Sequence, residues 1–241
     1  MIIMLIIGID EAGRGPVIGP MVMVGVLMDD VDEVMLKSLG VKDSKQLTQP
    51  QREKLYDSIR TIVKDFKVEI IHPVEIDKAV LSKSTNLNWL EAEHIIKLIS
   101  ELNNSSELNK SLGVKKSESN PKIAYIDCPS PNIKAYTEFL ANGLAKNKVK
   151  IKLIVTHKAD EKYISVSAAS IIAKVIREHE VKRLKEKHHV DFGSGYPSDP
   201  KTQEFLKKNY NNPKYKDIFR ESWSCYKILV EAKQQKRLGE Y

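Results

Sequence analysis

The segment GIDEAGRGPVIGP, residues 8–20, links two apolar stretches and decides how the chain begins to fold. Residues 1–10, MIIMLIIGID, and residues 21–29, MVMVGVLMD, both have the apolar, β-rich composition of buried strands. Because the link between them is short and rich in Gly and Pro, the two strands are expected to be antiparallel neighbours. The first strand ends in two adjacent carboxylates, Asp10 and Glu11, and an arginine, Arg14, follows closely.

The glycines of this link resemble a dinucleotide-binding loop, but their context argues against one. Such a loop needs the spacing G-x-G-x-x-G and a helix directly after it, whose N-terminus faces the phosphates. Here the glycines are Gly13, Gly15 and Gly19, and the next segment is strand-like. The carboxylates therefore need another explanation.

Helical and strand-like patterns alternate along the rest of the chain. Helical spacing occurs in 43–66, 86–103, 131–144 and 163–189, and strand-like patterns occur in 67–72, 122–127 and 149–157. This alternation predicts an α/β domain, and the antiparallel leading pair makes its sheet mixed. Residues 103–120 are polar and are expected to form an exposed loop. After Gly193, helical patterns over 203–210 and 216–236 follow without a strand, so we expect a catalytic domain of residues 1–192 and a C-terminal helical extension of residues 193–241.

Composition and charge limit the function classes. The 241 residues are 41% hydrophobic and 29% charged, which is typical of a globular protein. A net charge of +7 and a pI of about 9.1 favour a polyanionic partner such as nucleic acid, although charge alone is weak evidence. Cys128 and Cys225 lack disulfide or metal-ligand spacing. The N-terminus lacks a signal-peptide pattern, so we expect a cytoplasmic protein.

Two further acids follow strand-like segments as Asp10 and Glu11 do. Asp127 ends the strand-like segment 122–127, and Asp160 lies between 149–157 and the long helix. Carboxylates held close together repel one another unless a cation neutralises them, and Mg²⁺ or Mn²⁺ prefers oxygen ligands. Adjacent strand residues point to opposite faces, so Asp10 and Glu11 can share an ion only if the chain bends, which Gly13 and Gly15 would allow. Taken singly, Asp160 is explained nearly as well as a helix cap.

These residues and four further motifs resemble the ribonuclease HII family, with helical-tail features similar to its archaeal branch. The matching segments are GIDEAGRGPVIGP, VKDSKQLT, YIDCPSPN, HKADEKYISVSAASIIAKVIRE and GSGYPSDP, in that order from residue 8 to about residue 200. The resemblance implies a ribonuclease H-like fold with a central mixed five-stranded sheet flanked by helices. It also implies a nuclease that cuts the RNA strand of RNA/DNA hybrids and cuts 5′ of single ribonucleotides embedded in duplex DNA, leaving 3′-hydroxyl and 5′-phosphate ends.

The same resemblance assigns roles to single residues. It implies a two-metal site of Mg²⁺ or Mn²⁺ held by the catalytic acids Asp10, Glu11, Asp127 and Asp160. It places the contact to the ribose 2′-hydroxyl on Gly13, Arg14 and Gly15, and a junction-sensing tyrosine on Tyr196. A glycine-rich turn suits the 2′-hydroxyl because no side chain blocks the approach to its backbone groups.

Other candidate contacts are less specific. Lys45, Ser167, Ser170 and Lys174 are natural phosphate ligands, and the last three share one face of the predicted long helix. Tight helix packing explains the two serines equally well. The sequence ends in KRLGEY, which has no convincing sliding-clamp pattern, and we expect a monomer.

Two other functions remain possible on the sequence alone. A DNA-cutting nuclease or strand transferase could share the acids, but it would not need Gly13–Gly15 and Tyr196. A hybrid-binding protein without turnover is the other alternative, and the complete set of acids argues against it. The fold alone cannot distinguish the DNA-cutting nuclease or strand transferase from the ribonuclease, since one fold carries many activities.

Overall fold

The computed structural model describes residues 3–42, 47–104 and 120–238. The chain forms two compact units. Unit 1 comprises residues 1–12, 22–69 and 88–175, and unit 2 comprises residues 13–21, 70–87 and 176–241. No helix among the described residues is long and apolar enough to cross a bilayer. The predicted boundary between residues 192 and 193 remains a prediction.

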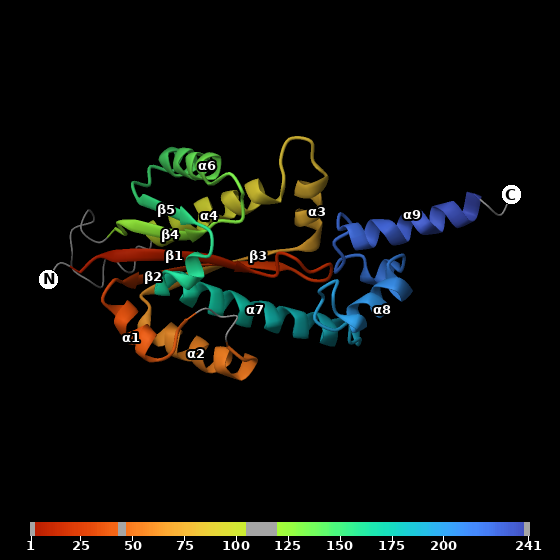
Figure 1. The fold of residues 1–241 in the computed structure, drawn as a ribbon, viewed down its shortest axis with the longest axis horizontal. Coiled ribbons are helices and arrows are strands. Elements are labelled where there is room, and N and C mark those ends of the chain that lie inside the picture. The colour runs from red at the N-terminus through yellow and green to blue at the C-terminus, as the bar shows by residue number, and fades with distance from the viewer. Residues whose placement is uncertain (1–2, 43–46, 105–119, 239–241) are drawn as a thin grey trace. The chain divides into compact units, whose positions relative to one another are not determined.

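A mixed five-stranded sheet forms the centre of unit 1, as predicted (Figure 1). Its strands are β1 (Leu5–Ala12), β2 (Met21–Asp29), β3 (Asp65–Ile71), β4 (Ile123–Asp127) and β5 (Lys152–Thr156), in the order β3-β2-β1-β4-β5. The antiparallel pairing of β1 with β2 is confirmed, and β4 runs parallel to both β1 and β5. The central strand β1 is buried almost throughout, which explains its continuous apolar sequence.

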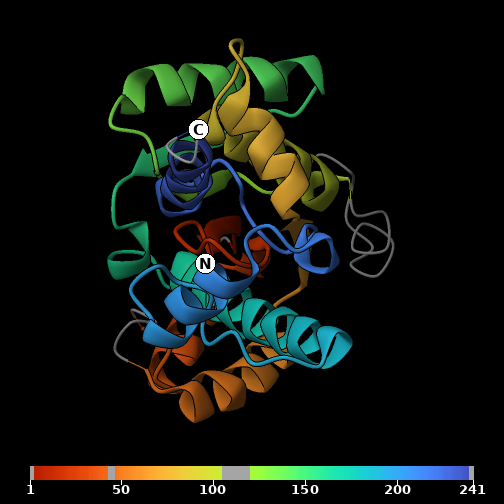
Figure 2. The ribbon, with the colours of Figure 1, turned by 90° about the vertical axis from the view of Figure 1, so that its right-hand side faces the viewer.

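Helices cover both faces of this sheet. Helices α4 (Leu87–Asn103) and α6 (Ile133–Lys146) lie on one face. Helices α1 (Asp32–Ser38), α2 (Gln49–Ile62) and the first part of α7 (Ile164–His188) lie on the other (Figures 1 and 2). Helix α2 begins after a capping box formed by Thr48 and Gln51, with Pro50 in its first turn.

The alternation of side chains along β1 sets how closely each helix layer approaches. A Cβ on Gly8 would lie 2.2 Å from the carbonyl carbon of Ser165, so only glycine allows the start of α7 to lie this close to β1. The next residue, Ile9, faces the other layer, where it and Leu102 of α4 enclose Gly25 of β2. Alternate residues of β1 therefore face α7 and α4.

Unit 2 has its own hydrophobic core. It contains α3 (Pro73–Leu81), the second part of α7, α8 (Pro200–Asn209), a 3₁₀ turn at Pro213–Tyr215 and α9 (Ser224–Leu238). Asp199 caps α8 by accepting a hydrogen bond from the N–H of Lys201. The core comprises Val17, Ile18, Val181, Leu184, Phe192, Leu206, Tyr215, Ile218, Phe219 and Tyr226.

Three differences from the sequence prediction have local explanations. The sequence pattern did not indicate α1 or α3, which have seven and nine residues and too few turns for a clear period. The helix predicted over 216–236 begins only at Ser224. Before that point the backbone is used elsewhere, because Phe219 forms a bridge with Ile18 and the N–H of Arg220 donates to Val17 O. Most of the loop predicted over 103–120 lies outside the described residues.

Candidate active site

Asp10 lies near the end of β1 on the side that faces α7. Its carboxylate is buried, at 5% exposure, and accepts hydrogen bonds from the hydroxyl of Ser170 on α7 and from the N–H of Glu11. Ser170 can reach Asp10 because Gly8, two residues earlier on the same face, lets α7 approach the strand. The packing of one helix on one glycine therefore orients this acid.

Glu11 belongs to the same regular strand as Asp10. The pairing of β1 with β2 continues through Glu11 and Ala12, opposite Met23 and Val22. No bulge therefore interrupts the pairing at the two acids, and the alternation of the strand places Glu11 on the α4 side, opposite to Asp10. The bend that the sequence analysis allowed at Gly13 and Gly15 comes after the strand has ended.

Asp127 joins Asp10 through the sheet register. Ile9 pairs with Ile126 in the parallel ladder, so the next residues, Asp10 and Asp127, are neighbours with the same orientation. The N–H of Ala159 donates to Asp127 Oδ1 over 2.8 Å. Ala159 begins the 3₁₀ turn η2 (Ala159–Glu161), which carries the buried Asp160. Asp10, Asp127 and the turn of Asp160 therefore meet at the carboxyl ends of β1, β4 and β5.

The electrostatics of this group suit a divalent cation. Burial raises the pKa of Asp10 well above its ordinary value, and the nearby carboxylates of Glu11 and Asp127 raise it further. Hard oxygen donors held this close are the chemistry that Mg²⁺ and Mn²⁺ require, so the acids fit such an ion. Within the described residues, however, no three His, Cys, Asp or Glu side chains are arranged as a metal-ligand set. The four-acid site remains a prediction.

The two predicted phosphate-contacting serines lie in the interior. Ser167 and Ser170 are each 1% exposed. Ser167 donates to the carbonyl of Asp160 over 2.5 Å and to that of Tyr163 over 3.2 Å, while Ser170 donates to Asp10. These contacts support the packing interpretation and give both serines a role in holding the acids. Lys174, one turn later on α7, is half-buried; the phosphate contacts of all three remain predictions.

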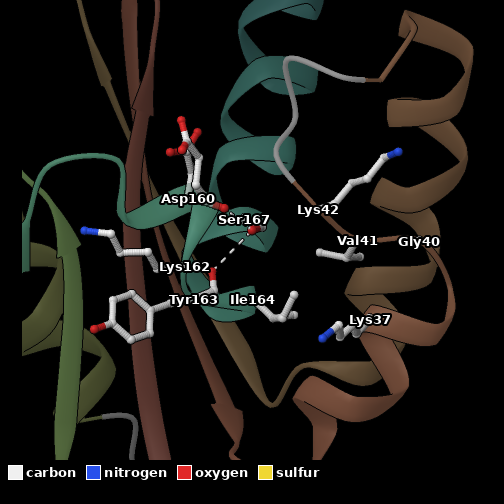
Figure 3. A pocket seen from close by; sticks show the side chains of 10 residues that line it. Lys37, Gly40, Val41, Lys42, Asp160, Lys162, Tyr163, Ile164 and Ser167 are labelled. Carbon is white, nitrogen blue, oxygen red and sulfur yellow. Dashed lines mark hydrogen bonds between the residues drawn. The ribbon is translucent and has the colours of Figure 1, made fainter.

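A cavity of about 690 Å³ opens beside Asp160 in unit 1. Its walls include three exposed lysines, Lys37, Lys42 and Lys162, together with Asp160 and Ser167 (Figure 3). Lys37 and Lys42 come from α1 and the segment after it, whereas Lys162 lies on the other side of Asp160. Basic side chains next to a buried acid suit a polyanion whose reacting group is held by the acids.

The turn at Gly13–Gly15 belongs to unit 2 and is fixed by a residue that the sequence analysis did not single out. Arg220 is fully buried and donates to Gly13 O (2.6 Å), Arg14 O (2.8 Å) and Gly19 O (3.1 Å). Gly13 has φ of +82°, which favours glycine, and a Cβ there would lie 2.3 Å from the Arg177 side chain.

Tyr196 lies on the surface of unit 2, close to the same turn. It is 39% exposed, and the guanidinium of Arg177 is 5.1 Å from the centre of its ring. A Cβ on Gly15 would make an ordinary contact with this ring at 3.7 Å. Arg177 also donates to Ser194 O over 3.2 Å. Gly13, Gly15 and Tyr196, far apart in sequence, thus form one group in unit 2.

Several other residues can now be assigned. Lys45 lies outside the described residues. His157 Nδ1 donates to Cys128 O over 2.8 Å and so ties the residue after β5 to the residue after Asp127. Glu91 of α4 is fully buried, and burial together with the nearby carboxylates of Asp127, Glu11 and Glu91 raises the pKa of the Cys128 thiol. His157 opens the motif HKADEKYISVSAASIIAKVIRE, but its contact with Cys128, 29 positions away, does not follow from the motif. Glu91 lies in none of the five motifs.

Comparison with known proteins decides the family. The family model described as Ribonuclease HII matches residues 7–226. The chain belongs to the ribonuclease HII family. Its activity class is therefore that of a type 2 ribonuclease H, a hydrolase that acts on nucleic acid. The match spans all five motifs of the sequence analysis, so the resemblance stated there is confirmed.

Individual relatives support the assignment of this chain to the ribonuclease HII family. Ribonuclease HII of Pyrococcus abyssi is 40% identical over 236 residues, which cover 98% of this chain and 95% of the relative. The crystal structure of ribonuclease H2 from Pyrococcus horikoshii OT3 has a TM-score of 0.76 at 40% identity and covers 95% of this chain and 98% of that one. The structure of the PCNA:RNase HII complex from Archaeoglobus fulgidus gives 0.68 at 41% identity, covering 84% and 85%. The predicted ribonuclease H-like fold is confirmed.

Proposed function

We propose that the protein is a Mg²⁺- or Mn²⁺-dependent endonuclease that cuts the RNA strand of RNA/DNA hybrids and cuts 5′ of single ribonucleotides in duplex DNA. The products are 3′-hydroxyl and 5′-phosphate ends. The observation that carries this proposal is the pair Asp10 and Asp127, which share one face at the ends of adjacent parallel strands, with the turn of Asp160 attached to Asp127. Membership of the ribonuclease HII family supports the substrate class.

The four acids Asp10, Glu11, Asp127 and Asp160 are the residues that would hold the metal ions. When bound, two such ions supply activation of the attacking water and stabilisation of the leaving 3′-oxygen at phosphorus. Glu11 faces the α4 side of the sheet, so Glu11 and Asp10 would contact the metal ions from opposite sides of β1. The raised pKa of Asp10 reflects burial beside Glu11 and Asp127, the arrangement that a cation would stabilise.

The remaining contacts orient these acids. Ser170 directs the Asp10 carboxylate, and the N–H of Ala159 directs that of Asp127. Ser167 fixes the backbone carbonyl of Asp160. Reaction within one bound geometry depends on such pre-positioned groups, because small displacements lower the rate steeply.

Recognition of the ribonucleotide is assigned to unit 2. Backbone groups at Gly13, Arg14 and Gly15 would contact the 2′-hydroxyl, which alone distinguishes RNA from DNA at a given nucleotide. The exposed ring of Tyr196 would stack on the sugar beyond it. Lys45, Ser167, Ser170 and Lys174 complete the proposed set as phosphate contacts.

We propose that the chain acts as a monomer and has a sliding clamp as a further partner. The support for the clamp is the 41% identical relative solved as a PCNA complex. Size-exclusion chromatography of the chain, alone and mixed with a clamp, tests both statements. Elution as a dimer would contradict the first, and unchanged elution with the clamp at micromolar concentration would contradict the second.

Cleavage of end-labelled duplexes tests the main proposal. Three duplexes of one sequence carry no ribonucleotide, one ribonucleotide or a full RNA strand, each assayed with Mg²⁺, Mn²⁺ or excess chelator. We expect metal-dependent cutting of only the two ribonucleotide-containing duplexes, with a 3′-hydroxyl at the cut. Cutting of all three would favour a DNA nuclease, and binding without cutting under every condition would favour a non-catalytic hybrid-binding protein.

A further inference from the structure

Arg220 makes an unusual set of contacts for an arginine in a helical tail. Its side chain has no exposed surface. Nη2 donates to Gly13 O, Nη1 to Arg14 O and Nε to Gly19 O, so one guanidinium binds three carbonyls of one turn. Burial of a guanidinium is costly, and carbonyl partners at these distances offset that cost only when the geometry is held. The contacts join residues more than 200 positions apart, all within unit 2.

These contacts fix which way the peptide groups of the turn point. The carbonyl of Gly13 shares a peptide plane with the N–H of Arg14, and the carbonyl of Arg14 shares one with the N–H of Gly15. Both peptide bonds are trans, so each N–H points away from its carbonyl. With both carbonyls bound to Arg220, the two N–H groups are directed away from it. Gly15 is exposed, so its backbone lies where a ligand can reach it.

The tail segment that carries Arg220 is itself held in place. The carboxylate of Asp77 on α3 accepts hydrogen bonds from the N–H of Glu221 (2.8 Å) and from the N–H (2.9 Å) and hydroxyl of Ser222. The backbone N–H of Arg220 donates to Val17 O over 2.8 Å. The segment is therefore anchored on both sides of the guanidinium.

Trp223 extends the same support to the third residue of the turn. Its Nε1 donates to Gly15 O over 3.0 Å, and its ring lies 4.9 Å from the guanidinium carbon of Arg220. The carbonyls of Gly13, Arg14 and Gly15 thus all accept from two neighbouring side chains of the tail. The backbone of the turn cannot rotate without breaking several of these bonds.

We propose that Arg220, supported by Trp223, is a positioning residue that sets the specificity for ribonucleotides by aiming the backbone N–H groups of the Gly13–Gly15 turn at the 2′-hydroxyl. This inference rests on the proposed function, in which that turn reads the 2′-hydroxyl. It makes the segment Phe219–Trp223 part of the recognition apparatus. Lysine cannot replace Arg220, because one ammonium cannot bind three carbonyls in the planar geometry of a guanidinium.

The test measures discrimination rather than activity. Full-length protein carrying Asp127→Asn, which prevents turnover, is titrated with a duplex containing one ribonucleotide and with the identical all-DNA duplex. The dissociation constant of the all-DNA duplex divided by that of the ribonucleotide duplex reports how strongly the 2′-hydroxyl is recognised. We compare this background alone, with Arg220→Lys and with Trp223→Phe. Arg183→Lys is the matched control, because it makes the same change of residue type at an exposed arginine of α7 that pairs with Glu180.

We expect the ratio to fall at least about 10-fold with Arg220→Lys and by a smaller factor with Trp223→Phe. Binding of the all-DNA duplex should stay within about twofold, and Arg183→Lys should change neither constant. A ratio that Arg220→Lys leaves unchanged in a folded protein would overturn the inference. So would equal weakening for both duplexes, which would indicate a merely structural residue.

Two further outcomes are kept distinct. If Arg220→Lys does not fold, as thermal melting would show, Trp223→Phe decides: a lower ratio supports the inference and an unchanged ratio overturns it. If the protein with native Arg220 and Trp223 binds both duplexes equally, the proposed function fails before the role of Arg220 is reached. The cleavage assay with three duplexes identifies that failure independently.

Discussion

The backbone N–H of Ala159 donates to Oδ1 of Asp127 over 2.8 Å and thereby attaches the turn that carries Asp160 to the end of β4. This hydrogen bond, from the residue directly before Asp160, links two acids that are 33 positions apart in sequence. Asparagine at position 127 keeps an oxygen that can accept this bond, which makes the charge and the anchor separable by mutation.

Asp127→Asn should reduce cleavage of the single-ribonucleotide duplex by about 1,000-fold or more, because a neutral amide is a poor ligand for the proposed metal ions. Its melting temperature should stay near the native value, since the bond from Ala159 is retained. Single-turnover cleavage and thermal melting measure the two effects. Asp57→Asn, at an exposed position on α2, is the control. Normal cleavage by Asp127→Asn would show that the proposed metal site is wrong.

Tyr196→Ala should lower cleavage at a single embedded ribonucleotide by about 10-fold, because it removes the ring that would pack on the sugar; for comparison, an aromatic ring stacked on a base contributes on the order of 1–3 kcal/mol. Tyr196→Phe should retain most activity, since the ring above Arg177 is preserved. Initial rates on the single-ribonucleotide duplex measure both. Equal rates for native protein and Tyr196→Ala would remove the proposed junction-sensing role.

Gly8→Ala should destabilise the protein by about 3 kcal/mol, because the new methyl group would meet the backbone of Ser165 at 2.2 Å and push α7 away from β1. Gly40→Ala is the comparison, since it meets nothing within 4 Å and costs only the left-handed φ of +94°, about 1 kcal/mol. Urea unfolding measures both. A Gly8→Ala effect no larger than that of Gly40→Ala would show that α7 does not need this close approach.

Tyr226 should make the protein less stable in alkali. Burial, and after it the nearby carboxylate of Glu221, together raise the pKa of its phenol to about 12 from the ordinary 10. The folded state thus binds the proton more tightly than the unfolded state. The resulting stability is fully present below pH 10 and is lost, by about 2 kcal/mol, as the pH rises from 10 to 12.

Tyr226→Phe isolates this effect because phenylalanine does not ionise. The variant should be less stable near pH 8, where the hydrogen bond from the phenol to Tyr210 O is lost. Its stability should then fall less steeply between pH 10 and 12 than that of the native protein. Urea unfolding at pH 8, 10, 11 and 12 measures the two slopes, and parallel curves would contradict the assignment.

The sequence predicted the mixed sheet and its main helices because those features leave periodic patterns within a few residues. Continuous apolar runs indicated β1 and β2, and the short Gly- and Pro-rich link indicated their antiparallel pairing, which the structure confirms. Short helices such as α1 and α3 span too few turns to produce a period. The pattern over 216–236 was helical in composition, but the pairing of Phe219 with Ile18 uses the backbone of its first part differently.

In the candidate site too, some features could be predicted from the sequence and others only from the tertiary structure. Asp10, Glu11, Asp127 and Asp160 could be proposed from strand-like segments and family motifs, which are properties of the sequence by itself. The tertiary structure alone decided that Asp10 and Asp127 share a face while Glu11 points to the other, because register and alternation are relations between strands. It alone also revealed the contacts that Gly8, His157 and Arg220 make. Their partners lie tens to hundreds of positions away, and no local pattern records which distant segment a folded chain will bring against a side chain.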